Sequence, residues 1–127
     1  MQLVDTDVLV DVLRKHPPAL TWLAALGSET LGMSGLVAME LLQGCRNRAE
    51  QRQVEKLWRP YHLYWPSQAD CLRAYDDFAG HHLSHDPGIP DAVIAETAVG
   101  LGVKLATFNE GHYRSVAYLR LTQPYER

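Results

Sequence analysis

The first thirteen residues constrain the fold of this chain more than any other stretch. Gln2 to Val4 is a short apolar run that stops at Asp5, and such a run is typical of a strand buried on both faces in a parallel sheet. Apolar residues then recur at helical spacing as far as Leu13, and Thr6 or Asp7 can cap that helix. Asp5 is therefore predicted to lie where a buried strand ends and a helix begins, which is where ligand crevices form in open α/β sheets.

Two interpretations of Asp5 compete at this point. As a turn residue, its carboxylate would bond a neighbouring backbone amide. As a site residue, it would need a cation or a hydrogen-bond donor, because an unpaired carboxylate at the end of a buried strand costs free energy.

The composition narrows the class of protein. A chain of 127 residues that is 46% hydrophobic and 21% charged is expected to form one domain, residues 1–127, without disulfides. Its net charge of −3 argues against coating nucleic acid through bulk charge, so such a partner needs local basic patches or bridging cations. Cys45 and Cys71 lack metal-binding spacing and are predicted to be reduced, mostly buried thiols of a cytoplasmic protein. Neither a signal peptide nor a membrane span is expected.

Strand and helix patterns alternate along the chain. Helices are expected at 8–13, 19–26, 35–43, 46–56, 67–83 and 91–101, and further strands at 30–33, 61–65, 103–106 and 118–121. Ser34 and Ser67 are predicted N-caps, and glycines at 27, 44 and 102 predict helix ends. This alternation favours a three-layer α/β/α architecture around a central, mainly parallel sheet.

Two other carboxylates lie at unusual positions. Glu40 is at the edge of the apolar face of its helix, where a carboxylate is rare unless it is paired or binds metal; a solvated helix glutamate is an equal alternative. Asp91 follows a proline-bracketed loop and opens a helix of small apolar residues, where it also suits the helix dipole.

A parallel sheet can bring these carboxylates together. If the first strand lies next to strand 103–106, then Asp5, Asp91 and the polar turn at 107–112 open on one rim, with Glu40 reaching it from a helix edge. Carboxylates in one pocket repel each other unless divalent cations neutralise them. Oxygen ligands suit Mg²⁺ and Mn²⁺, and these ions activate water and stabilise charge on a phosphoryl group.

Other polar groups allow weaker hypotheses. His81 and His85 have the four-residue spacing of a helical metal-ligand pair. However, no H-E-x-x-H motif surrounds these residues or the neighbouring His82. A structural or surface role is therefore favoured for the three histidines. The helix at 46–56 is net basic; such a run is usually a solvated face, but it can also supply phosphate contacts. The candidate contacts are Arg46, Arg48, Arg52 and Lys56.

Four segments together resemble a known family. Residues 3–11, 34–41, 89–95 and 105–109 look like the successive motifs of PIN-domain nucleases, in order and at normal spacing. The likeness is strongest to the VapC group, the toxins of bacterial and archaeal toxin–antitoxin pairs.

The resemblance implies a metal-dependent endoribonuclease that cleaves RNA with Mg²⁺ or Mn²⁺. It further implies restraint by a cognate antitoxin, a homodimer, and a toxin–antitoxin hetero-oligomer. Asp5, Glu40 and Asp91 match the acidic metal-site positions of the family, and Thr107 and Asn109 match its polar turn. One position departs from the pattern.

That position is His112, which stands where the family often has a further Asp. A fourth carboxylate is therefore absent, and His112 is a candidate metal ligand of different chemistry. A role in packing or in contacting an RNA phosphate is the alternative.

Two alternatives belong to other functional classes. A receiver domain of two-component signalling needs a phosphoacceptor Asp at the end of its third strand and a Lys at the end of a late strand. Here no Asp follows Trp65, and Lys104 begins its strand. A PIN-like module that only binds is the second alternative, and three intact carboxylates argue against it.

Overall fold

The computed structural model describes residues 1–26, 31–84 and 86–127. Within them the chain forms a five-stranded sheet in the order β3-β2-β1-β4-β5, and all four pairings are parallel. The strands are β1 (Gln2–Val4), β2 (Leu31–Ser34), β3 (His62–Tyr64), β4 (Lys104–Ala106) and β5 (Leu121–Thr122).

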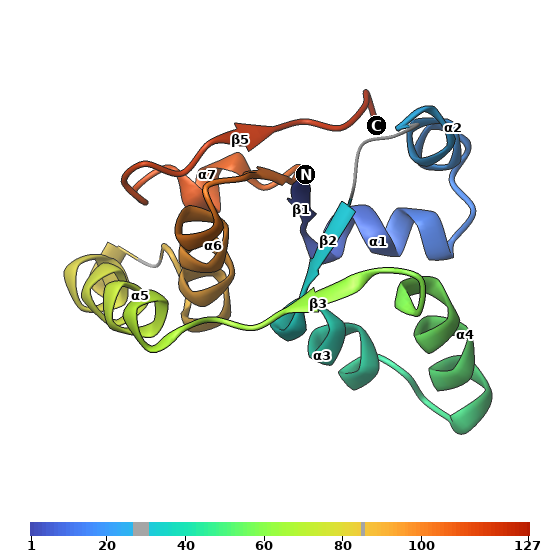
Figure 1. The fold of residues 1–127 in the computed structure, drawn as a ribbon, viewed down its shortest axis with the longest axis horizontal. Helices are drawn as coiled ribbons and strands as arrows, with labels where there is room; N and C mark the ends of the chain where they lie inside the picture. Colours follow the sequence, from blue (N-terminus) through green and yellow to red (C-terminus); the bar gives the residue numbers. More distant parts are fainter. Residues whose placement is uncertain (27–30, 85) are drawn as a thin grey trace.

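Helices cover the two faces of this sheet, which confirms the predicted α/β/α architecture. In Figure 1, α5 and α6 lie on one side of the strands, and α1, α2 and α4 lie on the other. The helices are α1 (Thr6–Leu13), α2 (Pro17–Ala25), α3 (Gly35–Gln43), α4 (Arg48–Trp58), α5 (Gln68–His81), α6 (Ile89–Leu101) and α7 (Glu110–Tyr113), with a 3₁₀ turn η1 (His82–Ser84) after α5. None of the helices in the described ranges is long and apolar enough to cross a membrane.

The strand register aligns the carboxyl ends of the three central strands. Val4 of β1 pairs with Met33 of β2 and with Ala106 of β4, so the residues that follow these partners emerge at the same edge. This order also argues against a receiver-type arrangement, in which the third strand flanks the first, because β3 here lies at the far edge beyond β2.

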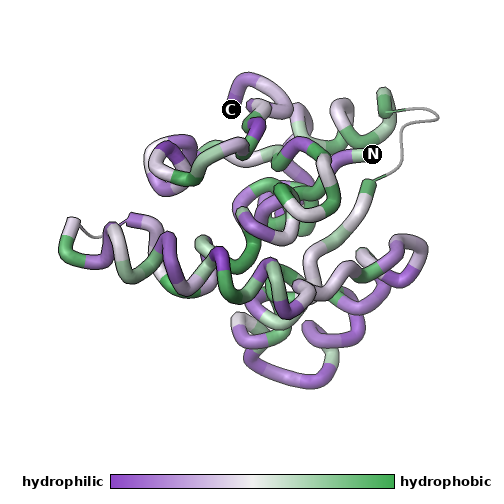
Figure 2. The backbone as a smooth tube through the Cα atoms, turned by 60° about the vertical axis from the view of Figure 1, so that its left-hand side comes forward, coloured by the Kyte–Doolittle hydropathy of each residue, from purple (hydrophilic) through white to green (hydrophobic). Residues whose placement is uncertain are grey.

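The core lies between the sheet and the helices. Leu3, Ile94 and Leu105 are fully buried, and each such side chain stabilises the fold by about 1.5–3 kcal/mol. The small side chains of Ala95 and Ala98, also fully buried, let α6 lie close to the sheet, as its sequence predicts. In Figure 2, hydrophilic and hydrophobic segments alternate along the helices, as expected for helices that pack one face inward.

Most predicted helix ends are confirmed by their capping contacts. Ser34 caps α3, and Ser67 forms a reciprocal capping box with Asp70 at the start of α5. Gly102 ends α6 in the left-handed conformation, at φ 69°, which glycine adopts without strain. The end predicted at Gly27 lies outside the described residues.

Three local predictions are wrong. The cap of α1 is Asp5 rather than Thr6 or Asp7, so the helix starts at Thr6, two residues before the start at Val8 that its apolar pattern indicates. The last strand is Leu121–Thr122, because the chain turns at Tyr118, which has φ 66° and is exposed. Cys71 is exposed and Cys45 only half-buried, since the stretch of α5 that carries Cys71 faces away from the core.

The edges of other elements differ by one to three residues. Strand β2 includes Ser34 and begins at Leu31 within the described residues, so the predicted start at residue 30 is not described. Helix α4 begins at Arg48 because the side chain of Asn47 accepts a hydrogen bond from the amide of Glu50 and caps it.

Helix α5 packs its polar side against α6. Arg73 of α5 donates to the Glu96 carboxylate of α6 over 2.9 Å, while Leu72 and Tyr75 remain 61% and 70% exposed. Gly100 of α6 lets α5 approach closely, because a Cβ at this position would stand 2.1 Å from Oδ1 of the buried Asp70. Ion pairing therefore supplements a narrow apolar contact of α5, in which Ala74 is 3% exposed.

Candidate active site

Asp5 lies at the centre of the sheet edge and gathers donors from three elements. Its backbone N–H donates to the carbonyl of Ala106 over 2.9 Å, which ties the ends of β1 and β4 together. Carboxylate Oδ1 accepts from the Thr6 amide at 2.8 Å, and Oδ2 accepts from Thr107 Oγ1 at 2.9 Å and from Tyr113 Oη at 2.8 Å. The interpretation of Asp5 as a turn residue accounts for the bond from the Thr6 amide. It does not account for the bonds from the Thr107 and Tyr113 hydroxyls.

Thr107 and Asn109 form the polar turn after β4. Thr107 is fully buried, and its hydroxyl accepts from the amide of Asn109 at 3.0 Å while it donates to Asp5. Asn109 is exposed at the start of α7, and its side chain makes no capping hydrogen bond. The backbone of the turn therefore serves to aim the Thr107 hydroxyl at Asp5.

Asp91 approaches the same edge from the first turn of α6, as predicted. Its Oδ1 lies 3.3 Å from Tyr113 Oη, and its Oδ2 lies 3.5 Å from Nδ1 of the half-exposed His112. Burial raises the pKa of Asp91, and the negative charge of Asp5 raises it further. The structure thus brings Asp5, Asp91, Thr107 and His112 into one cluster.

Glu40 completes the acidic group from α3. It is half-buried, and its Oε1 is buried without a hydrogen-bond partner among the described residues. Burial raises the pKa of Glu40, and the charges of Asp5 and Asp91 add to this effect. The charges of the three predicted carboxylates therefore act on one another at this edge, and the neighbouring Thr6 hydroxyl partly offsets the rise in the pKa of Glu40.

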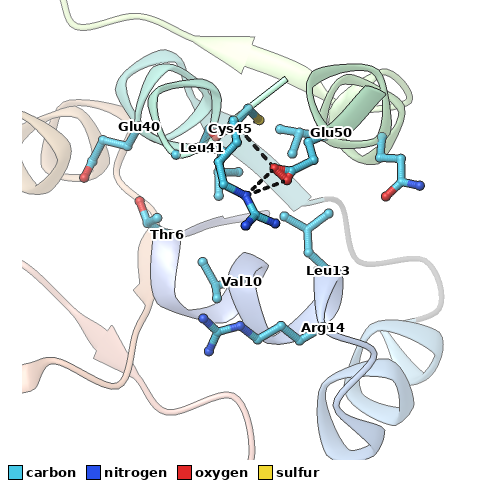
Figure 3. Close-up of a pocket in the computed structure, with 12 residues that line it drawn as sticks. Thr6, Val10, Leu13, Arg14, Glu40, Leu41, Cys45 and Glu50 are labelled. Carbon is cyan, nitrogen blue, oxygen red and sulfur yellow. Dashed lines mark hydrogen bonds and ion pairs between the residues drawn. The ribbon is translucent and has the colours of Figure 1, made fainter. Parts of the chain in front are cut away.

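An open cavity of about 480 Å³ extends from Glu40 between α1, α3 and α4. Figure 3 shows Glu40 and Thr6 at one end of this cavity and Glu50 at the other, with Val10 and Leu13 along α1. The cavity therefore combines an apolar wall with an acidic end that belongs to the carboxylate cluster.

The four basic residues predicted to contact RNA phosphates differ in their surroundings. All four are exposed, and only Arg46 lines the cavity, where its Nε lies 3.1 Å from Oε1 of Glu50. Arg48, Arg52 and Lys56 follow one another at four-residue spacing along α4, so they share a face of that helix.

Two residues of this site escaped the sequence analysis. Asp7 Oδ2 accepts from the Phe108 amide at 2.9 Å, which joins α1 to the turn after β4; burial, followed by the charge of Asp5, raises the pKa of Asp7. Its signal was its place two residues after Asp5. Tyr113 carried no signal, because it follows the polar turn at 107–112, where no apolar period predicts a buried side chain, yet its ring is buried.

The donor chemistry of the cluster fits a hard divalent cation. Asp5, Glu40 and Asp91 offer carboxylate oxygens, which Mg²⁺ and Mn²⁺ prefer, and the unpartnered Oε1 of Glu40 lacks a positive partner. Within the described ranges, no three His, Cys, Asp or Glu side chains are arranged to hold a metal as they stand.

Of the three histidines at 81, 82 and 85, the structure describes the first two, and neither belongs to a group of three possible metal ligands among the described residues. His81 Nδ1 lies 3.0 Å from the Asp77 carbonyl of its own helix, as the structural interpretation predicts. His82 is exposed and stacks on Phe78, with ring centroids 5.4 Å apart, and His85 lies outside the described residues.

Comparisons with known proteins agree with this geometry. Residues 3–117 match the family described as PIN domain. Ribonuclease VapC10 of Mycobacterium tuberculosis (strain ATCC 25618 / H37Rv) is 34% identical over 115 residues, which cover 89% of this chain and 86% of the relative.

Solved structures share the fold. A toxin–antitoxin complex from Klebsiella pneumoniae aligns with a TM-score of 0.79 at 21% identity and full coverage of both chains. VapBC-1 from nontypeable Haemophilus influenzae aligns with a TM-score of 0.80 at 22% identity over 97% of each chain. The match across residues 3–117, supported by a relative of this similarity, shows that the chain belongs to the PIN domain family.

Proposed function

We propose that this protein is a metal-dependent endoribonuclease and the toxin of a toxin–antitoxin pair, acting in the cytoplasm. The observation that carries the proposal is the convergence of Asp5 and Asp91 around the Tyr113 hydroxyl at the carboxyl edge of the sheet, with Glu40 of α3 near enough for their charges to raise its pKa. The similar VapC10 is named a ribonuclease. The single domain 1–127 would then inhibit translation and growth by cutting RNA.

Asp5, Glu40 and Asp91 would hold Mg²⁺ or Mn²⁺, with His112 as a further candidate ligand. Such an ion supplies charge neutralisation and an activated water at the scissile phosphodiester. The chain itself orients the ligands: the Thr107 hydroxyl fixes Asp5, and Asn109 fixes the turn that carries Thr107. RNA phosphates would meet the basic residues, which are Arg46, Arg48, Arg52 and Lys56.

The cavity beside Glu40 is where we place the antitoxin. Its apolar residues Val10, Leu13 and Leu41 suit an apolar helix or strand, and an arginine from that segment could pair with Asp5 or Asp91 and displace metal. The Klebsiella neighbour is described as a toxin–antitoxin complex. We further propose a homodimer within this hetero-oligomer.

The test of the nuclease is the removal of single charges. Asp5→Asn and Asp91→Asn should each lower RNA cleavage by about 10²-fold or more, because the cation and its water lose a ligand. Asp76→Asn, at an exposed position on α5, is the matched control and should cleave as the wild type does. Circular dichroism must show that all three variants are folded. Near-normal cleavage by Asp5→Asn would remove the proposed site.

The binding-only alternative predicts a different result. A module without catalysis would bind RNA, leave it intact with either ion, and show no change in RNA cleavage on substitution of the carboxylates. RNA that remains intact with the purified wild-type protein in Mg²⁺ and in Mn²⁺ would favour that alternative.

A further inference from the structure

Tyr113 is a core residue whose polar atom reaches the acidic site. It ends α7, its side chain is 1% exposed, and its ring packs in the same cluster as Leu3 and Ile94. A buried phenol needs a hydrogen-bond partner. Here the hydroxyl meets two partners, and both are candidate metal ligands.

One proton serves these two contacts. Tyr113 Oη lies 2.8 Å from Asp5 Oδ2 and 3.3 Å from Asp91 Oδ1, and a phenol has a single O–H to donate. The shorter contact takes the proton, so the hydroxyl donates to Asp5. With that proton committed to Asp5, the phenol oxygen has none to donate to Asp91, so Asp91 stands beside Asp5 at this point without a hydrogen bond from the phenol to its ionised carboxylate.

The two oxygens of Asp5 are occupied unequally as a result. Oδ2 receives two hydroxyl donors, from Thr107 and Tyr113, whereas Oδ1 receives only the Thr6 amide. A carboxylate oxygen offers about two lone-pair positions. Oδ2 is therefore saturated, and Oδ1 is the oxygen of Asp5 with a position left for a ligand.

We propose that Tyr113 is a positioning residue of the metal site: with Thr107 it anchors Asp5 Oδ2, so that Oδ1 is presented to a divalent cation next to Asp91. This inference rests on the proposed metal dependence and names a residue that acts through Asp5 rather than on the RNA. Donors behind a ligating carboxylate typically contribute 10- to 100-fold to metal affinity.

The experiment compares Tyr113→Phe with Tyr125→Phe. Both changes delete a phenol that donates to an aspartate over 2.8 Å, but Tyr125 bonds Asp11 outside the carboxylate cluster. Mn²⁺ binding is measured by calorimetry and by the electron paramagnetic resonance signal of free Mn²⁺. Tyr113→Phe should weaken Mn²⁺ binding about tenfold, and Tyr125→Phe should leave it unchanged.

RNA cleavage gives a second, separable measurement. For Tyr113→Phe, the Mn²⁺ concentration for half-maximal cleavage should rise about tenfold, while the rate at saturating Mn²⁺ stays close to the wild-type rate. A general structural defect would instead lower the saturated rate. Should Tyr113→Phe fail to fold, Thr107→Val removes the other donor to Oδ2 and should also weaken Mn²⁺ binding.

The possible results separate this inference from the proposed function. Equal Mn²⁺ affinity for wild type and Tyr113→Phe overturns the positioning role alone. Mn²⁺ binding that weakens as expected, in a protein that does not cleave RNA, supports the positioning role and overturns the nuclease. A wild-type protein that binds no Mn²⁺ overturns both.

Discussion

Replacing Thr107 with valine tests whether its hydroxyl or its packing matters at the sheet edge. The residue is fully buried, and valine has nearly the same shape. The substitution deletes the donor to Asp5 Oδ2 and the acceptor of the Asn109 amide. Packing alone predicts a small effect on stability, whereas the hydrogen bonds predict a large one.

The magnitude follows from the kinds of bond involved. A hydrogen bond to a charged group contributes about 1.5–3 kcal/mol, and water can replace the acceptor lost by the exposed Asn109. Thr107→Val should therefore lower the free energy of unfolding by about 2–3 kcal/mol. Thr107→Ser keeps the hydroxyl and loses one buried methyl group, which costs about 1 kcal/mol.

Urea unfolding followed by circular dichroism in EDTA measures these differences without bound metal. Valine, the better match in shape, should destabilise more than serine, and it should also lower RNA cleavage while serine largely retains it. If the valine protein proves as stable as wild type, or more stable than the serine protein, the Thr107 hydroxyl does not hold Asp5 at the sheet edge.

Three further predictions concern ligands, pH and partners. If His112 binds metal, His112→Asp should shift the preference of cleavage toward Mg²⁺ and His112→Ala should weaken activation by Mn²⁺; identical metal titrations for all three proteins would exclude a ligand role. Burial, followed by the neighbouring Glu96 carboxylate, raises the pKa of Asp77 from 3.8 to about 7. The folded state thus binds this proton more tightly than the unfolded state, so wild-type stability should fall relative to Asp77→Asn as pH rises through that interval, in urea unfolding at a series of pH values; parallel curves would contradict this. Expression of the protein alone should halt growth, and co-expression of its antitoxin should restore it; harmless high-level expression with intact RNA would contradict the toxin assignment.

Local patterns determined much of the fold. A buried run that ends at Asp5, the serine caps of α3 and α5, and the alternation of strands with helices depend on residues close together in the chain. Helical period and capping act over four residues or fewer, so they are readable without knowledge of the fold. The same holds for Asp91, whose place in the first turn of α6 follows from the loop before it.

The weakest local signals gave the wrong boundaries. Strand β5 has only two residues, too few for any period to show. The exposure of Cys71, and of Leu72 and Tyr75, depends on which side of α5 meets α6. The ion pair of Arg73 with Glu96 decides that choice, and an apolar stripe cannot reveal a partner 23 residues away.

Tertiary structure decided which side chains donate hydrogen bonds to Asp5. Thr107 and Tyr113 meet Asp5 across 102 and 108 residues of chain, a contact that exists only because β4 pairs with β1. The sequence by itself was enough to single out Asp5, Glu40 and Asp91 as candidates, since residue type and position at strand and helix ends mark them, and their binding of a cation stays a prediction. Only the folded chain decided which oxygen of Asp5 keeps a lone-pair position for a ligand, because hydrogen-bond donors compete for lone pairs in three dimensions and leave no periodic trace in the sequence.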